Sequence, residues 1–263
     1  MGKSIGILSL KGGVGKTSIV VALGDVFADL GKKVLLVDGN LSAPNLGLHL
    51  NIIDPLVTLH GVLSREKNLN ESIHKLDKFD VIPASIFTNK EVNPLTLKNK
   101  VNFLKKKYDI ILIDSPPSLG EEGLATILAS DEMIVVTTPD YPTISATIKA
   151  IKMAKQRGIK LNGLILNKVY KKKFELDISD IEKVLELPVM AIIPHDINVV
   201  KAMNYFTPST SYKPKSQGST EFKKLAAVLI GEKYKSFRIR NLIKITPSKS
   251  DVNRELFYER VFE

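Results

Sequence analysis

Short apolar segments rich in β-branched residues alternate with amphipathic segments along most of the chain. The apolar segments predict buried strands at 4–10, 33–38, 79–85, 108–115, 132–138, 161–168 and 189–194. Because most of them are apolar at consecutive positions, both faces of each strand are expected to be covered by helices. The alternation therefore predicts an α/β fold with a doubly wound, mostly parallel sheet in three layers.

The amphipathic segments predict the helices between these strands. After the first strand, apolar residues recur at helical spacing before a natural stop at Gly31; they are Ile19, Ala22, Leu23, Val26, Phe27 and Leu30. Ser179 and Glu182 have the spacing of a capping box, which predicts a helix start at Ser179. Segment 221–231 predicts a last helix. The alternation of apolar and amphipathic segments stops after residue 231. We therefore expect one folded domain over 1–231 and a C-terminal extension over 232–263.

Composition narrows the chemistry. The 263 residues include no cysteine, which excludes disulfides, thiolate zinc sites and cysteine-ligated iron–sulfur clusters. The four histidines lack the spacing of metal ligands, and we interpret them as structural or surface residues. No apolar stretch reaches the ~18–20 residues of a membrane span, and no signal peptide is evident, so we expect a cytoplasmic protein. The net charge of +10 favours a polyanionic partner.

The segment SLKGGVGKTSIV, residues 9–20, places a glycine-rich turn between the first predicted strand and helix. Backbone amides and the helix dipole make such a turn an anion site, and glycines let the backbone close around a phosphate. Lys16 is expected to reach the β- and γ-phosphates, and Thr17 to bind Mg²⁺. The predicted nucleotide-binding residues are Lys11, Gly12, Gly13, Val14, Gly15, Lys16, Thr17 and Ser18. The motif G-x-x-x-x-G-K-[ST] itself is not matched, because Leu10 stands at its first glycine.

Two aspartates end predicted strands at the edge of the sheet where ligands of open α/β sheets collect. Asp114 follows four apolar residues, the form expected of an aspartate that holds Mg²⁺ through water. Asp38 ends the second strand and opens a polar loop. We predict that Asp38, Asp114 and Thr17 form the metal site.

Three motifs, KGGVGKT, VDGNLSAPNLG and DSPPSLGEEG, together resemble those of the MinD/ParA ATPases, the deviant Walker A group of P-loop proteins. The resemblance covers about residues 3–231 and includes IPHDINVVKAM. It implies ATP and Mg²⁺ as ligands and a homodimer in the ATP state. In that family the extra lysine reaches the partner's phosphates, so the resemblance implies that Lys11 acts in trans. It also implies that Asn167 contacts adenine and that Pro194 walls the base.

Asn40 departs from the family pattern. Many MinD-type proteins carry an aspartate there that orients the attacking water, whereas an amide orients water by hydrogen bonds but accepts no proton. We therefore expect a slow ATPase, below ~1 s⁻¹, with the catalytic residues Lys11, Lys16, Asn40 and Asp114. Segment 115–123 is rich in Pro, Gly and Ser. It is interpreted either as a loop that changes shape with the γ-phosphate or as a rigid connector.

The extension 232–263 has six basic residues and no acidic one between 233 and 250. Its segment 237–245 favours a strand, and 251–262 is compatible with a helix. Three roles stay open: a membrane-targeting element, a docking segment for a partner or the sister chain, and a basic patch for nucleic acid. Lys105–Lys107 and Lys171–Lys173 would also suit a sequence-independent DNA contact.

The resemblance implies a MinD-like ATPase switch. ATP dimerises it, the dimer engages a membrane surface or a protein activator, and slow hydrolysis releases it, in service of spatial positioning such as division-site placement. Its expected location is the cytoplasm, with peripheral contact at the inner face of the cell membrane. One alternative is a ParA-type ATPase that binds DNA non-specifically, which is less favoured. A second alternative is a weakly hydrolysing, nucleotide-dependent scaffold.

Overall fold

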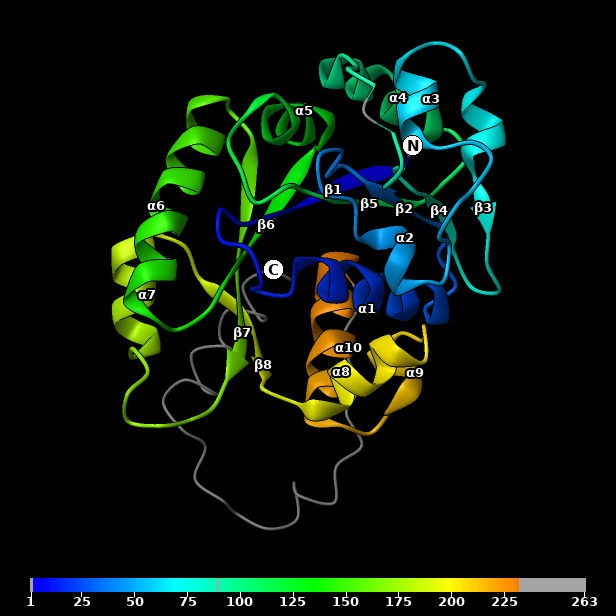
Figure 1. The fold of residues 1–263 in the computed structure, drawn as a ribbon. Helices are drawn as coiled ribbons and strands as arrows, with labels where there is room; N and C mark the ends of the chain where they lie inside the picture. Colours follow the sequence, from blue (N-terminus) through cyan, green and yellow to red (C-terminus); the bar gives the residue numbers. More distant parts are fainter. Residues whose placement is uncertain (1, 89, 232–263) are drawn as a thin grey trace.

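The computed structural model describes residues 2–88 and 90–231. Within these ranges the chain forms one eight-stranded sheet of order β3-β4-β2-β5-β1-β6-β7-β8 (Figure 1). The strands are β1 Lys3–Leu8, β2 Val34–Asp38, β3 His74–Lys75, β4 Asp80–Ile82, β5 Ile110–Asp114, β6 Glu132–Thr137, β7 Lys160–Val169 and β8 Val189–Pro194. Every neighbouring pair is parallel except β3 and β4. The predicted α/β fold with a mostly parallel sheet is confirmed.

Helices cover both faces of this sheet (Figure 1). They are α1 Lys16–Asp29, α2 Leu46–His49, α3 Leu59–Leu63, α4 Leu97–Leu104, α5 Glu121–Ala129, α6 Tyr141–Gln156, α7 Ile178–Leu185, α8 Ile197–Asn204, α9 Ser209–Tyr212 and α10 Gln217–Leu229. Short 3-10 turns lie at Leu69–Ser72 and Pro94–Thr96. Among the described residues, no helix combines the length and the apolarity needed to cross a membrane.

The core explains why the strands are apolar at consecutive positions. In β6, Ile134 and Val136 pack in the cluster that contains α1 and α10, whereas Val135 packs on the opposite side with α6 and α7. Alternate side chains of one strand therefore enter different apolar layers. With both faces buried, the sheet keeps its polar side chains for the strand ends, where the candidate site lies.

Three details of the predicted elements are corrected. The capping box at Ser179 does not form: α7 begins at Ile178 after Asp177, and no side chain caps it. Glu182 Oε1 instead accepts a hydrogen bond from the N–H of Val189, at 2.7 Å, and so ties α7 to the start of β8. The last helix begins earlier than predicted, at Gln217, because Ser216 supplies its N-cap. Strand β3 is missing from the predicted strands, because its two residues are too few to give a periodic signal.

The predicted strand at 237–245 and the predicted helix at 251–262 lie outside the described residues.

Candidate nucleotide-binding site

The glycine-rich loop 9–15 joins β1, which lies between β5 and β6, to the start of α1. Gly13 and Gly15 have positive φ values of 76° and 94°, a conformation that side chains disfavour. A Cβ at Gly15 would also lie 2.4 Å from Asn167 Nδ2, whereas one at Gly12 or Gly13 would meet no atom within 4 Å. No side chain caps the N-terminus of α1. The loop therefore combines an open side with an electropositive helix end, which suits a phosphate chain.

Strand β7 supports this loop from the other side. Asn167 Nδ2 donates to the carbonyl oxygen of Val14 at 2.7 Å, and Lys168 Nζ donates to that of Gly13 at 2.6 Å. Asn167, expected beside adenine, is thus buried against the phosphate loop with one amide hydrogen engaged. Pro194 ends the neighbouring strand, opposite Val169. Nothing in the local sequence of Lys168 signals its contact, and sequence reasoning missed it.

Asp38 and Asp114 are direct neighbours in the parallel register of β2 and β5, and both are buried. Asp114 Oδ2 accepts a hydrogen bond from Thr17 Oγ1 at 2.6 Å, and its Oδ1 has no hydrogen-bond partner among the described residues. Both oxygens of Asp38 are engaged by backbone N–H groups, Oδ1 by Asn40 at 3.2 Å and Oδ2 by Leu46 at 3.1 Å. Asp38 therefore organises the loop after β2, while Asp114 keeps a free oxygen.

Burial shifts the ionisation of all three charged groups at this edge. It raises the pKa of Asp114 to about 6, against the hydrogen bond from Thr17 and the charge of Lys16. Burial, and then the charge of Asp114, raise the pKa of Asp38 well above its usual value. The pKa of Lys16 is lowered, because burial outweighs the attraction of Asp114. Burying two carboxylates beside one lysine costs folding free energy unless a further cation balances the second negative charge.

Thr17 and Asp114 fit a divalent cation. Hydroxyl and carboxylate oxygens are ligands that Mg²⁺ takes, usually with waters and substrate phosphates completing its coordination. The unpaired, buried Oδ1 of Asp114 is the atom that points to such an ion. No group of three or more His, Cys, Asp or Glu residues in the described part of the chain could hold a metal ion. A site of few protein ligands is the arrangement that phosphate-bound Mg²⁺ uses.

The loop after β2 is held by its own contacts and by α5. Asn40 is buried, and its Nδ2 donates to the carbonyl oxygen of Ala43. Ser42 donates from both its hydroxyl and its N–H group to the carboxylate of Glu122, the N–H at 3.2 Å. Glu122 lies in the first turn of α5, directly after segment 115–120. The loops that follow β2 and β5 are therefore joined.

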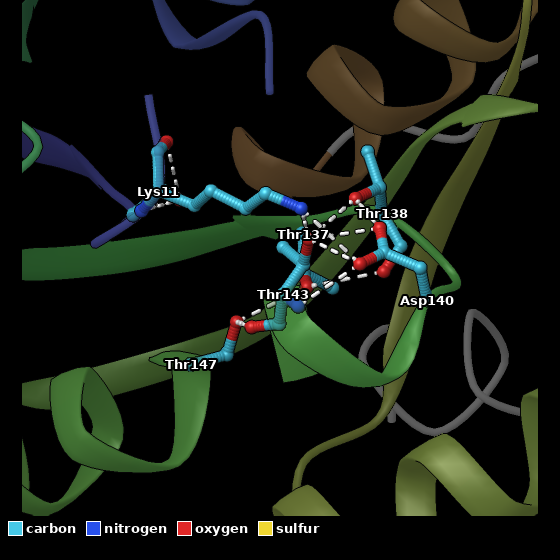
Figure 2. A network of polar contacts seen from close by, with 7 residues as sticks. Lys11, Thr137, Thr138, Asp140, Thr143 and Thr147 are labelled. Atoms are coloured by element: carbon cyan, nitrogen blue, oxygen red, sulfur yellow. Dashed lines mark hydrogen bonds and ion pairs between the residues drawn. The ribbon is translucent and has the colours of Figure 1, made fainter. Parts of the chain in front are cut away.

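Lys11 contacts its own chain at the start of α6 (Figure 2). Its Nζ donates to Thr143 Oγ1 at 2.7 Å and lies 3.2 Å from Asp140 Oδ1. Asp140 is also the N-cap of α6 and accepts the N–H of Thr143 at 3.0 Å. Partial burial acts to raise the pKa of Asp140, but hydrogen bonds from Thr138, Thr143 and Lys11 lower it. Sequence reasoning missed Asp140, although an aspartate two residues before a proline is an N-cap signal.

Ser18 lies in the first turn of α1, where its Oγ contacts Met203 Sδ of α8 at 3.7 Å.

Comparison with known proteins assigns the family. Residues 2–165 match a family model described as an AAA domain, and residues 91–245 match one described as 4Fe-4S iron sulfur cluster binding proteins of the NifH/frxC family. An uncharacterized ATP-binding protein of Methanocaldococcus jannaschii is 34% identical over 90% of each chain. The septum site-determining protein MinD of Bacillus subtilis is 32% identical over 88% of this chain and 90% of its own. The chain belongs to the MinD/ParA family of P-loop ATPases.

Solved structures of MinD share its fold. MinD of Pyrococcus horikoshii, complexed with Mg-ADP, superposes with a TM-score of 0.83 at 32% identity, over 87% of this chain and 96% of its own. The MinC:MinD complex of Aquifex aeolicus gives a TM-score of 0.80 at 25% identity, over 90% and 98%. Since this MinD/ParA member has no cysteine, it lacks the thiolates that ligate an iron–sulfur cluster in the NifH/frxC proteins.

Proposed function

We propose that this MinD/ParA family member binds MgATP at the loop 9–18 and hydrolyses it slowly to ADP and phosphate. One observation carries the proposal: the Thr17–Asp114 pair sets a buried, unpaired carboxylate oxygen beside the open glycine loop and the start of α1. The Mg-ADP complex of P. horikoshii MinD and the ATP-binding relative of M. jannaschii support it.

In this proposal each predicted residue has a defined task. Backbone N–H groups of the loop, from Gly12 to Ser18, bind the phosphates, and Lys16 neutralises the β- and γ-phosphates. Thr17, Asp38 and Asp114 form the Mg²⁺ site, and Asp38 also fixes the adjacent loop through the N–H groups of Asn40 and Leu46. Bound Mg²⁺ supplies charge neutralisation on the phosphate oxygens. Asn167 and Pro194 border the adenine.

The proposal includes a homodimer in the ATP state, with Lys11 delivered to the partner's phosphates. Such a cation in trans is worth roughly 10³–10⁵ in rate where arginine fingers have been measured. Here Nζ of Lys11 contacts Asp140 and Thr143 of its own chain, so the ammonium must leave that position first. About two fifths of each of the two charged side chains is exposed (44% and 42%), which makes this exchange feasible in water.

Slow turnover is supported by the position of Asn40. Its Nδ2 donates to Ala43, so the amide that would orient the attacking water is already engaged within its loop. Hydrolysis then needs a rearrangement of residues 40–43, in addition to the release of Lys11. Both requirements favour a switch that persists in the ATP state and is released by an activator.

We further propose that the ATP-bound dimer engages an anionic membrane surface or a protein partner and serves spatial positioning. The septum site-determining relatives support this role, and the complex of A. aeolicus MinD with MinC supports a protein partner. In this proposal residues 1–231 are the ATPase domain, and the basic extension 232–263 makes the surface or partner contact.

The test is phosphate release with and without Mg²⁺, in parallel with the molar mass in ADP and in a non-hydrolysable ATP analogue. We expect slow, Mg²⁺-dependent release and a doubled mass only with the analogue. Lys16→Ala should abolish both, Lys11→Ala should abolish the release, and Lys171→Ala should match the wild type. Release equal in all four proteins, or no nucleotide binding, would overturn the proposal.

The surface is identified by flotation with anionic liposomes at fixed ionic strength, with plasmid DNA as competitor. Flotation with the analogue but not with ADP supports the membrane. Retention with DNA would favour the ParA-type alternative. Binding to neither would leave a protein partner as the target of the switch.

A further inference from the structure

Two consecutive side chains of β7 contact two consecutive carbonyl oxygens of the phosphate-binding loop. Asn167 Nδ2 donates to Val14 at 2.7 Å, and Lys168 Nζ donates to Gly13 at 2.6 Å. The N–H of a trans peptide points opposite to its C=O. The N–H groups of Val14 and Gly15 therefore point away from β7, so contact with the strand leaves them available to a phosphate.

A regular strand could not make both contacts, because its successive side chains point to opposite faces. The pairing of β7 with β8 is irregular between Leu166 and Val169, where Asn167 and Lys168 lie. Lys168 also has a φ of 55°, a left-handed conformation that is disfavoured for lysine. This local departure from the strand brings the Lys168 side chain to the same loop as Asn167. Backbone strain of this kind persists where surrounding contacts determine it.

We infer that Lys168 is a positioning residue for phosphate binding, acting through the Gly13 carbonyl. Its ammonium fixes the Gly13–Val14 peptide with the N–H of Val14 facing the ligand, and it polarises that peptide so that the N–H is a stronger donor. Lys168 adds a third cation to the loop, beside Lys11 and Lys16. The inference rests on the proposed nucleotide site, but the backbone positioning exists without nucleotide and can be tested without it.

The chain offers a matched control. Lys171 is also exposed and has nearly the same φ, 59°, so Lys168→Met and Lys171→Met remove the same charge at residues with a similar positive φ. In the nucleotide-free protein we expect hydrogen exchange of residues 12–16 to accelerate in Lys168→Met and to remain unchanged in Lys171→Met. Lys168→Arg, which can still donate to Gly13, should restore protection.

Calorimetry with ADP then measures the consequence for the ligand. Loss of one charge-assisted hydrogen bond at an exposed position should weaken ADP binding about tenfold in Lys168→Met, with little change in Lys171→Met. Adenosine, which has no phosphate, should compete equally well in all proteins. A merely structural role would lower thermal stability without separating ADP from adenosine.

The outcomes are distinct. Hydrogen exchange and ADP affinity that match the wild type in both Met variants would overturn the inference. Equal losses in both would show a general effect of positive charge and would also overturn it. Faster exchange in Lys168→Met in a protein that binds no ADP would retain the loop positioning and refute the nucleotide site.

Discussion

Lys11 Nζ lies 3.2 Å from Asp140 Oδ1 of the same chain, so the cation proposed to serve a second subunit is held by its own. Each of the two side chains is nearly half exposed, and exposed ion pairs contribute only about 0–1 kcal/mol. The contact is therefore weak enough to be exchanged for a phosphate. In the proposed dimer, the partner's phosphates would compete with Asp140 for this ammonium group.

Removing the carboxylate that holds Lys11 should favour the dimer. Asp140→Ser keeps an N-cap side chain for α6 and eliminates the ion pair. We expect the dimer dissociation constant in a non-hydrolysable ATP analogue to fall up to about fivefold, the equivalent of one exposed ion pair. Sedimentation over a concentration series measures it. The control is Glu186→Gln, which removes the exposed Lys155–Glu186 pair elsewhere on the surface. A constant equal to that of the control contradicts the prediction.

Asn40→Asp should increase turnover. A carboxylate cannot donate to the carbonyl oxygen of Ala43, so the side chain loses its present contact and can turn toward the attacking water. We expect a faster steady-state rate of phosphate release and a loss of about 1 kcal/mol in stability, the value of one hydrogen bond. Asn45→Asp, in the same loop but more exposed, is the control. An unchanged or slower rate in Asn40→Asp would sink the hypothesis.

Asp114→Asn should stabilise the nucleotide-free, metal-free protein at neutral pH. The folded-state pKa of about 6 exceeds the ordinary 3.8, so the folded chain binds this proton more tightly than the unfolded chain does. The stabilisation that this proton gives the folded state is fully present below the unfolded-state pKa of 3.8. It is lost as the pH rises through the folded-state pKa of about 6. We expect a gain on the order of 1–3 kcal/mol at about pH 7.5, and less at about pH 5.

Thermal unfolding in EDTA at the two pH values measures this gain. The same variant should lose the extra stability that MgADP confers on the wild type, since the carboxylate proposed to hold Mg²⁺ is absent. A gain of the same size at both pH values would show that ionisation of Asp114 is not its cause. A loss of stability at both would refute the prediction outright.

Glu122→Gln should uncouple the loops after β2 and β5. The two oxygens of the Glu122 carboxylate accept the hydroxyl and the N–H of Ser42, one each. An amide has a single acceptor oxygen without a negative charge, so it can replace only one of the two bonds, and more weakly. We expect faster hydrogen exchange at residues 40–45 in the variant. In the wild type, a non-hydrolysable ATP analogue should protect segment 115–123 from hydrogen exchange more than ADP does. This difference between the two ligands should be smaller in the variant.

Glu121→Gln is the control for this experiment, because Glu121 shares the first turn of α5 and its favourable interaction with the helix dipole. Identical exchange in the two variants would mean that the contact with Ser42 carries no coupling. Protection of 115–123 that does not differ between ADP and the analogue would support a rigid connector.

Sequence patterns were sufficient to predict the architecture, because a strand that is buried on both faces is a continuous apolar run in the sequence. They failed where a contact depends on how separate elements meet in space. Glu182 and Ser179 have capping-box spacing, yet Glu182 accepts the N–H of Val189, seven residues later at the start of β8. The partners of Lys11 and Gly13 likewise lie 129 and 155 residues away.

The strand order distributes the candidate site over two parts of the sheet. Asp38 and Asp114 end strands on one side of β1, whereas Asn167, near the end of β7, and Pro194, at the end of β8, lie on the other side. A nucleotide bound as proposed would contact residues on both sides of β1 and would link the two parts of the sheet. Unfolding that separates them must release the ligand, so its binding free energy protects the whole sheet by mass action. The nucleotide concentration would thereby set the stability of the protein as well as its activity.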